Sequence, residues 1–574
     1  MTECDHPQRP TLAAWHSALA GDDDASLPRE ARELLRKSIE QARILLALAE
    51  DGAAAPGEHD DDALRGVPAD LMWRAPLEIW RQAAGEVLAA EPAAGGESSA
   101  AALAYQRAFQ DYQRVLARVG RETLTRVGER WRARHATDAD GGHGQAGVRE
   151  LLDMLVDEGE ACYLAAVSDE HFAEVGGRLV NALTALAGAA GVSAAPPGAA
   201  AVASSAACED DTAAHDTAAV LRDLHISPAR AAAELRAIDA KIGVALETLR
   251  DVGPIDVGTC PREVVLREGK MTLYRYRDGN EPPRGPPLLV VYALANRPYM
   301  LDLEPRRSLI RALLREGLDV YLIDWGYPDE TDRGLGLDHY VDIALGRCIG
   351  RVRADHALER LDVLGVCQGG TFALCHAALH PERIGRLVLM VTPVDFHTPD
   401  NLLTRWLRHV DVDALVDTLG NIPGELLNWA FVSLKPLRLT GYKYLEMLDA
   451  FDDPDRARTF LRMEKWIHDS PAQAGEAFRQ FAKDLLQGNR LVEGELHIGG
   501  ARVDLARITM PVLNVVARHD HIVPPAASLA LERHIAAAEY AVHIFEGGHI
   551  GIYVSERAQR EIPATIAGWL LARR

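Results

Sequence analysis

A single stretch, residues 361–374 (LDVLGVCQGGTFAL), constrains the fold of this chain more than any other. An apolar run predicts a buried strand, three glycines surround Cys367, and residues 371–380 have helical character. This spacing is typical of the sharp strand–turn–helix that presents a nucleophile at the end of a sheet strand, where serine is usual. A Cβ at the flanking glycines would collide with the neighbouring strand and helix. The simpler interpretation is a glycine-rich turn with a buried cysteine.

Further apolar runs separated by helical segments surround this turn. The runs are 288–292, 320–323, 361–364, 387–391, 512–516 and 541–545. Their near-continuous apolar character predicts a mostly parallel sheet covered on both faces. A long helical interruption rich in Trp and Leu separates the last two runs from the others, and we interpret it as a cap over the strand ends, at about 396–505. The fold class expected for residues 227–574 is therefore α/β, an α/β-hydrolase-like sheet with an inserted helical cap.

The part of the chain before residue 227 predicts an all-α domain. Residues 1–65 are acidic and Ala-rich, with one helix expected over 28–50, residues 66–190 are helical in pattern, and 191–226 have the composition of a flexible linker. Three apolar stripes predict three helices; their residues are Tyr105, Phe109, Tyr112, Leu116, Val119, Leu124, Val127 and Trp131, then Leu151, Leu152, Leu155, Ala161, Tyr163, Leu164 and Ala165, then Phe172, Val175, Leu179 and Leu183. Such stripes usually form a bundle core, and a partner-binding face is the alternative.

Composition excludes several classes of function. A net charge of −22 over 574 residues argues against a nucleic-acid partner, because no basic footprint is present to neutralise phosphates. Seven cysteines without metal-like spacing suggest reduced thiols in a cytosolic protein. The polar N-terminus carries no secretory signal pattern, and the Ala/Gly stretch 182–207 is interrupted by prolines, so we expect no membrane span.

A thiol nucleophile needs a base and an orienting acid, and two downstream residues fit these roles. Asp520 follows the apolar run 512–516, and His549 follows the run 541–545. Both therefore leave the carboxyl end of a strand, where Cys367 also lies, and the chain order of nucleophile, acid and base is that of α/β-hydrolases. His521, next to the acid, is the less favoured alternative for the base. A turn-capping Asp and a solvated loop His are the structural alternatives.

The surroundings of Cys367 predict how an acyl intermediate would be stabilised. The positive end of the following helix and His549 as proton acceptor both favour the thiolate. The backbone N–H of Gln368 and one from the loop at Ala295 and Asn296 are the expected oxyanion donors.

A histidine pair on the same helix has another interpretation. His376 and His380 are spaced as a metal-binding pair, but no third ligand is evident in the sequence. We expect surface histidines at the end of the helix and no metal. Cys348 and Cys375 are expected to be core thiols.

Several motifs together resemble one enzyme family. They are Gly365-Val-Cys-Gln-Gly-Gly370, Asn296-Arg-Pro-Tyr-Met300, Tyr321-Leu-Ile-Asp-Trp-Gly326, Val391-Thr-Pro-Val-Asp395, Gly420-Asn-Ile-Pro-Gly424, Asp520-His-Ile-Val-Pro524 and Gly547-Gly-His-Ile-Gly551. From about residue 227 to its end the chain resembles the catalytic subunit of class III polyhydroxyalkanoate synthases, and residues 66–190 more weakly resemble the partner subunit, PhaE. The family normally keeps these subunits as separate chains, whereas here one polypeptide holds both.

The resemblance implies a function and a set of site residues. The family nucleophile falls on Cys367, its aspartate on Asp520 and its histidine on His549. The implied substrate is an (R)-3-hydroxyacyl-CoA, with 3-hydroxybutyryl-CoA the expected unit, and the product is a polyester released with free CoA. No cofactor is implied. A homodimer or larger assembly, in the cytoplasm at the surface of polyester granules, is the implied setting, and the substrate-binding residues of the cap are not identified.

Cysteine as the nucleophile distinguishes among three hypotheses. Attack by a thiolate on an acyl-CoA exchanges one thioester for another at nearly equal free energy, so the acyl group stays activated for a second transfer. The second hypothesis is a Cys–His–Asp hydrolase, such as an acyl-CoA thioesterase, which would need neither the large cap nor the fused helices. The third is a granule-coating protein in which the helical part does the work.

Overall fold

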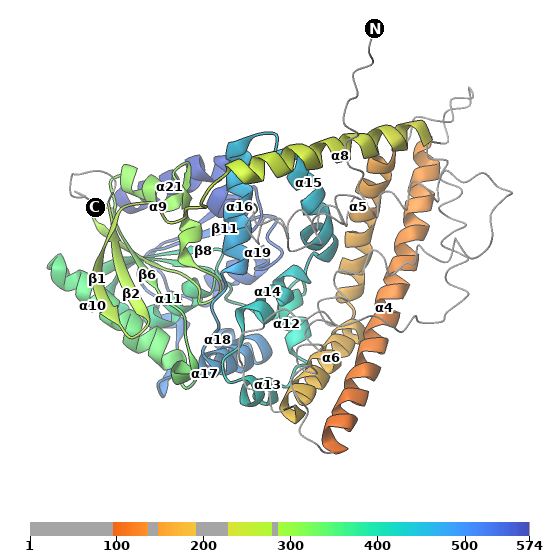
Figure 1. Ribbon diagram of the computed structural model, residues 1–574. Helices are drawn as coiled ribbons and strands as arrows, with labels where there is room; N and C mark the ends of the chain where they lie inside the picture. The colour runs from red at the N-terminus through yellow and green to blue at the C-terminus, as the bar shows by residue number, and fades with distance from the viewer. Residues whose placement is uncertain (1–95, 136–146, 191–227, 278–284, 573–574) are drawn as a thin grey trace, which may run out of the picture.

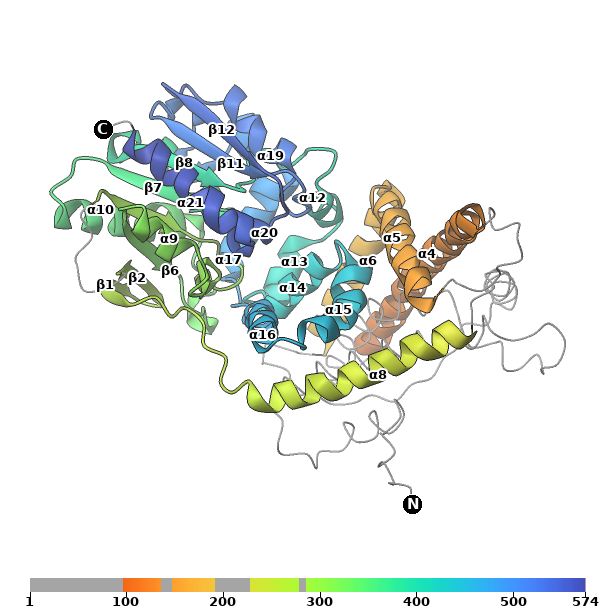
Figure 2. The same cartoon turned by 90° about the horizontal axis from the view of Figure 1, so that it is seen from above.

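The computed structural model describes residues 96–135, 147–190, 228–277 and 285–572. The helix expected over 28–50 and the linker expected over 191–226 lie outside these residues. A sheet with its covering helices occupies one side of the molecule, the N-terminal helices occupy the other, and a layer of short helices lies between them (Figures 1 and 2).

Eight strands form the central sheet, in the order β1-β2-β6-β3-β7-β8-β11-β12. They are β1 (Arg262–Glu268), β2 (Met271–Tyr276), β3 (Pro287–Val291), β6 (Asp319–Asp324), β7 (Leu361–Val366), β8 (Ile384–Met390), β11 (Val512–Ala517) and β12 (Tyr540–Phe545). From β6 to β12 all neighbours are parallel. The six apolar runs of the sequence supply these six strands, so that prediction is confirmed. Their carboxyl ends meet at one edge of the sheet.

Two antiparallel strands extend the sheet where the sequence analysis expected none. β1 pairs with β2, and β2 pairs with β6. β1 lies at the edge of the sheet and is largely exposed, with charged residues at both ends of Arg262–Glu268. Its apolar run, residues 264–266, is only three residues long and lies between charged residues, which is why the pattern used to find the buried strands missed it.

Helices cover both faces of the sheet, and β3 shows how its residues are divided between them. Leu288 and Val290 point into the core beneath α9 (Leu309–Arg315) and α21 (Glu556–Leu571). Leu289 and Val291 point into the opposite core, beneath α10 (Leu345–Asp355) and α11 (Gln368–Leu379). All four side chains are fully buried. Burial on both faces explains why the strand is apolar at successive positions instead of alternating.

The insertion between β8 and β11 is mainly helical and forms the cap. Its elements are α12 (Leu402–Leu407), α13 (Val412–Leu419), α14 (Gly424–Val432), η6 (Arg438–Tyr442), α15 (Lys443–Ala450), α16 (Pro454–His468), α17 (Gly475–Gln480), η7 (Phe481–Gln487), α18 (Arg490–Glu493) and a short β9–β10 hairpin (His497–Ile498 and Ala501–Arg502). Asn401, Asp411 and Asp453 cap the helices that follow them by accepting hydrogen bonds from backbone N–H groups.

Three N-terminal helices form the outer layer: α4 (Gly96–His135), α5 (Val148–Val167) and α6 (Glu170–Ala189). The stripe predicted for α4 is buried, apart from Phe109, which is partly exposed. The prediction for α5 is wrong at Ala161, Leu164 and Ala165, which are exposed, Leu164 by 51%. A fourth helix, α8 (Pro228–Asp251), runs from these helices across to the sheet domain (Figures 1 and 2). Within the described ranges, no helix is both long and apolar enough to cross a membrane.

The apolar stripes also pack against the cap. Leu402, Leu434 and Leu437 of the cap share one core with α4, α5 and α6. Polar contacts accompany this packing: the hydroxyl of Tyr163 donates to the carbonyl of Ser433 at 2.8 Å. The buried residues of the stripes therefore form the core of a combined helix–cap unit.

Asn181 of α6 hydrogen-bonds the cap on two sides. Its Nδ2 donates to the carbonyl of His409 at 2.9 Å, and its Oδ1 accepts the backbone N–H of Asp411 at 2.8 Å. A Cβ built on Gly177, one turn earlier, would lie 2.3 Å from the Cβ of His409. The close approach of α6 to the cap therefore requires a glycine at this position.

The neighbouring glycines of α6 provide a test of this contact. We expect Gly177→Ala to destabilise the protein by about 1–3 kcal/mol, because the added methyl collides with His409. Gly176→Ala is the matched control, since nothing lies within 4 Å of its Cβ, and it should be stabilising by about 0.5–1 kcal/mol. The urea midpoint of unfolding, followed by Trp fluorescence, measures both. Equal shifts in the two variants would contradict the contact.

Candidate active site

Cys367 lies at the tight turn between β7 and α11, as the sequence predicts. Its backbone is in a rare conformation for a residue with a side chain, with φ 52° and ψ −126°. The turn is held by hydrogen bonds: the N–H of Cys367 donates to the carbonyl of Met390 at 2.9 Å, and its own carbonyl accepts the N–H of Gly370 at 2.9 Å. The surrounding structure therefore fixes a strained turn that places the thiol at the sheet edge.

The three glycines around Cys367 permit this turn because no Cβ fits at their positions. A Cβ on Gly365 would lie 2.4 Å from the Cα of Gly370, and one on Gly369 would lie 2.3 Å from the carbonyl oxygen of Val291. A Cβ on Gly370 would lie 1.8 Å from Oγ1 of Thr392. The collision with neighbouring strands and helix that the sequence analysis expected is thus present.

Asp520 and His549 reach the same edge from the loops after β11 and β12. Nδ1 of His549 donates to Oδ2 of Asp520 at 2.6 Å, and both residues are only 6% exposed. Oδ1 of Asp520 accepts the backbone N–H groups of Ile522 and Val523, at 2.9 and 2.8 Å. These hydrogen bonds fix the carboxylate and set the imidazole tautomer, which leaves Nε2 for the thiol.

The side chain of Cys367 lies near enough to the imidazole of His549 for its charge to act on that ring, so the structure brings the three residues together. Burial alone would lower the pKa of His549, but the negative charges of Asp520 and Cys367 outweigh it and raise the pKa to about 10. The carboxylate of Asp520 therefore stabilises the imidazolium, the form that this base takes once it has accepted the proton of a cysteine nucleophile.

His521 does not take the place of the base. Both oxygens of its neighbour Asp520 are engaged elsewhere, one by His549 and the other by backbone N–H groups. Burial lowers the pKa of His521 to about 4, and the positive charge of Lys435 adds to this effect. His521 is therefore neutral, without the hydrogen bond to an acid that a general base in this chemistry requires.

The loop expected to donate to an oxyanion lies next to the turn. The side-chain oxygen of Gln368 accepts the backbone N–H of Leu294 at 3.0 Å, which ties the loop after β3 to the start of α11. Asn296 adopts a left-handed conformation, with φ 58°. The residues expected to supply the donors, Gln368, Ala295 and Asn296, thus belong to two segments that are hydrogen-bonded to each other.

Two buried tyrosines beside the thiol were not identified from the sequence. Burial raises the pKa of both Tyr292 and Tyr553, and the charge of Cys367 raises it further. The ring of Tyr553 meets the ring of His549 edge to face at 5.8 Å. Tyr292 directly follows β3, and Tyr553 lies four residues after His549. Their closeness in the sequence to a central strand and to the predicted base is the signal that could have identified them.

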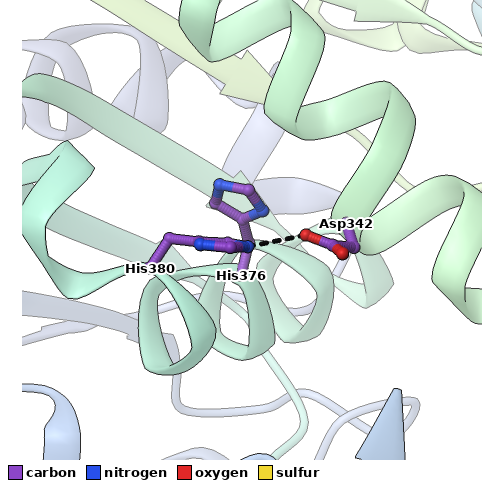
Figure 3. Close-up of side chains that lie close together, drawn as sticks. All are labelled: Asp342, His376 and His380. Carbon is purple, nitrogen blue, oxygen red and sulfur yellow. Dashed lines mark hydrogen bonds and ion pairs between the residues drawn. The ribbon is translucent and has the colours of Figure 1, made fainter. Parts of the chain in front are cut away.

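A second cluster, on the other side of α11, corrects the prediction for the histidine pair. His376 is completely buried, not on the surface, and burial lowers its pKa to about 4. Its Nδ1 donates to the carbonyl of Val341 at 2.8 Å, and Nε2 of His380 donates to Asp342 at 2.6 Å (Figure 3).

Asp342 is the third potential metal ligand of this cluster, which the sequence did not reveal. One nitrogen from each histidine and a carboxylate oxygen lie within 4.8 Å of one another, so the group could hold a divalent cation. Nδ1 of His376 and Nε2 of His380 are already hydrogen-bonded, to Val341 and Asp342 respectively. We assign no metal to this cluster.

The pKa of His549 gives a pH-dependent test of the site. Asp520→Asn removes a charge that outweighs burial, so we expect the pKa to fall from about 10 towards the ordinary value of about 6.5. Between about pH 7 and 9 the wild-type imidazole then stays protonated while that of the variant loses its proton. Imidazole 13Cε1 and 15N shifts against pH measure this, with the signal assigned by its loss in His549→Gln.

The exposed Asp400 provides the control for this titration, since Asp400→Asn should leave the midpoint unchanged. An unchanged midpoint in Asp520→Asn would show that the carboxylate does not stabilise the imidazolium.

Comparison with known proteins identifies two regions. Residues 286–556 match the family model described as "alpha/beta hydrolase fold", and residues 96–189 match the model described as "Poly(R)-hydroxyalkanoic acid synthase subunit (PHA_synth_III_E)". The second match covers the helices α4, α5 and α6.

Curated relatives match more than half of the chain. The "Poly(3-hydroxyalkanoate) polymerase subunit PhaC" of Allochromatium vinosum is 52% identical over 349 residues, which is 60% of this chain and 98% of that protein. The proteins of the same name from Thiocystis violacea and Synechocystis sp. are 51% identical over 351 residues and 50% identical over 326, covering 99% and 86% of their lengths. The chain therefore belongs to the PhaC family of poly(3-hydroxyalkanoate) polymerases, of class III, with a PhaE-like region at its N-terminal side in the same polypeptide.

Proposed function

We propose that Cys367 accepts the acyl group of an (R)-3-hydroxyacyl-CoA and passes it on to a growing polyester. The observation that carries the proposal is the buried hydrogen bond between Asp520 and His549 at the carboxyl edge of the sheet, with the charge of Cys367 acting on the imidazole and the cap lying over the site. The family's naming as a poly(3-hydroxyalkanoate) polymerase supports the same reaction. The expected monomer is 3-hydroxybutyryl-CoA, on the strength of the resemblance to class III synthases.

In the first step the thiolate of Cys367 attacks the carbonyl carbon of the acyl-CoA. The new C–S bond forms as the bond to the CoA sulfur breaks, and the proton held by His549 leaves with CoA. Because one thioester replaces another, the acyl group remains activated. Backbone N–H groups of Gln368 and of the loop at Ala295 and Asn296 would bind the oxygen as it becomes negative.

In the second step a 3-hydroxyl group attacks the acyl thioester and forms the ester bond of the polymer. His549, now neutral, is positioned to accept the hydroxyl proton, and the thiolate of Cys367 is released. By family analogy Asp520 contributes to activating this hydroxyl, besides orienting His549. The chain thereby grows by one unit and the nucleophile is restored.

Hydrolysis is the alternative outcome of the same intermediate. A Cys–His–Asp thioesterase would release free 3-hydroxyacid if water reached the acyl-cysteine. The cap and its packing against four N-terminal helices favour the polymerase, because exclusion of water preserves the thioester until the hydroxyl arrives.

The proposal extends to the setting of the enzyme. A polymerase that keeps its product attached would lie at the surface of the polyester granule that it makes, in the cytoplasm where acyl-CoA is available. We further propose a homodimer or larger assembly, and the fused PhaE-like helices would hold the two functions in a one-to-one ratio.

The test of the reaction supplies (R)-3-hydroxybutyryl-CoA and follows CoA release and turbidity together. We expect Cys367→Ser to keep the fold and to lose polymer formation by roughly 10³-fold or more, since an oxoester does not keep the acyl group activated. Cys375→Ala, a buried thiol on the same helix, is the control and should remain active. CoA release with free 3-hydroxybutyrate and no turbidity would favour the hydrolase, and full activity of Cys367→Ala would favour the coating protein.

A second test concerns the N-terminal helices, which we propose hold the cap in its active arrangement. Gly177→Ala should lengthen the lag or slow CoA release by about twofold or more, because it disturbs the contact between α6 and the cap. Gly176→Ala should leave the time course unchanged. Deletion of residues 1–225 should have a larger effect in the same direction. Unchanged kinetics in Gly177→Ala, despite a lowered unfolding midpoint, would contradict this role.

A further inference from the structure

The C-terminal end of cap helix α16 contacts the loop that follows β3. The indole N–H of Trp466 donates to the carbonyl of Arg297 at 2.9 Å. In return, Nδ2 of Asn296 reaches the carbonyl of Trp466 at 3.4 Å and Oδ1 of Asn428 at 3.5 Å. Asn428, on α14, also donates to the carbonyl of Ile467 at 2.6 Å. Two cap helices and the loop thus form one hydrogen-bonded group.

The sheet domain holds the same loop from two other sides. Gln368 accepts the N–H of Leu294, next to the nucleophile turn. The guanidinium of Arg297 pairs with Asp324 at 2.8 Å and donates to the carbonyl of Gly326 at 3.0 Å. Leu294 and Arg297 are therefore anchored to the sheet domain. The side chain of Asn296, which lies between them, is held by the cap.

Asn296 is the residue of this loop that most needs such support. Its φ of 58° lies in the left-handed region, which is less stable than the extended or right-handed regions for a residue with a Cβ. A loop held in this conformation aims its backbone N–H groups in directions that a relaxed loop would not keep. Loss of the contacts on one side would allow the loop to relax.

Helix α16 is itself held in place by the N-terminal part of the chain. Lys465 donates to the carbonyl of Ile255 at 2.9 Å, and Arg462 donates to the carbonyl of Asp256 at 2.9 Å, in the segment that follows α8. Ala457 shares a core with the apolar face of α8. A continuous set of contacts therefore leads from α8 through α16 to the loop beside Cys367.

We propose that Trp466, assisted by Asn428, is a positioning residue for the oxyanion-binding loop, so that the docked cap completes the site in addition to covering it. The inference rests on the proposed acyl transfer at Cys367. Trp466 does not touch the reacting atoms in this role. It fixes the carbonyl of Arg297 and thereby the peptide groups of Ala295 and Asn296, which face the acyl oxygen as it becomes negative.

The position of Trp466 relative to the nucleophile supports this role. Trp466 and Tyr292 belong to one apolar core, against which Cys367 packs. Trp466 is 7% exposed and packs in the same core as the strands that end at the site. A cap side chain is thus built into the layer of residues around the thiol.

Single-turnover acylation tests the proposal in the full-length chain. With protein in excess of (R)-3-hydroxybutyryl-CoA, acid quench and intact mass follow the adduct on Cys367. We expect Trp466→Phe to lower the rate constant of acylation by about tenfold, with half-saturation changed by less than about twofold, since transition-state stabilisation is lost but substrate binding is not. Trp406→Phe is the matched control: Trp406 lies in the same cap, and its indole N–H is buried without a hydrogen-bond partner among the described residues.

Amplitude and rate constant separate positioning from a loss of folded protein. A merely structural role would reduce the amplitude of adduct formation and leave the rate constant unchanged, and this result would overturn the proposal. Asn428→Leu should lower the rate constant in the same direction, and the double variant should lose less than the sum of the two, because both act on one loop. If Trp466→Phe does not fold, Asn428→Leu decides alone.

The same experiment distinguishes a failure of the proposed function. Absence of an adduct on Cys367 in the wild-type chain would refute the acyl-transfer mechanism. A wild-type adduct that forms at the same rate in Trp466→Phe, or a rate lowered equally in Trp406→Phe, would refute only the positioning role of Trp466.

Discussion

The close packing of the turn at Cys367 against β3 and β8 is the constraint on which the site depends. Gly369 approaches the backbone of Val291, and Gly370 approaches Thr392, at distances that exclude any side chain. This packing forces the strained backbone of Cys367 and directs its thiol to the sheet edge. Since the strands are parallel, the same edge receives the loops after β11 and β12, so Asp520 and His549 reach the edge at which Cys367 lies.

Backbone strain is concentrated at this edge. Cys367, Asn296 and Val391 each follow a central strand, and each has a positive φ. Val391 is the most notable, because a β-branched residue rarely adopts that conformation. Its N–H donates to Val515, which shows that the sheet continues to hold it. The strain is tolerated because the central strands β3, β7 and β8, which precede these residues, are largely buried on both faces and over-determine these positions.

The cap and the N-terminal helices form one packed unit above the site. Apolar residues of α4, α5, α6 and α8 share cores with cap helices, and hydrogen bonds from Tyr163 and Asn181 cross the same boundary. Fusion of the PhaE-like region to the PhaC region makes this contact intramolecular, which removes the entropic cost of bringing two subunits together. The contact reaches the site through α16, whose last turn holds the loop at Asn296.

The sequence by itself determined the six central strands and the places of Cys367, Asp520 and His549, because these depend on local features: apolar runs, glycines and residues at strand ends. Only the tertiary structure decided the features that depend on long-range contacts. The exposed strand β1 has only a short apolar run, Asp342 meets His376 and His380 from another helix, and Trp466 of the cap reaches Arg297. A sequence pattern reports burial along one element, whereas these contacts depend on which elements lie together in space.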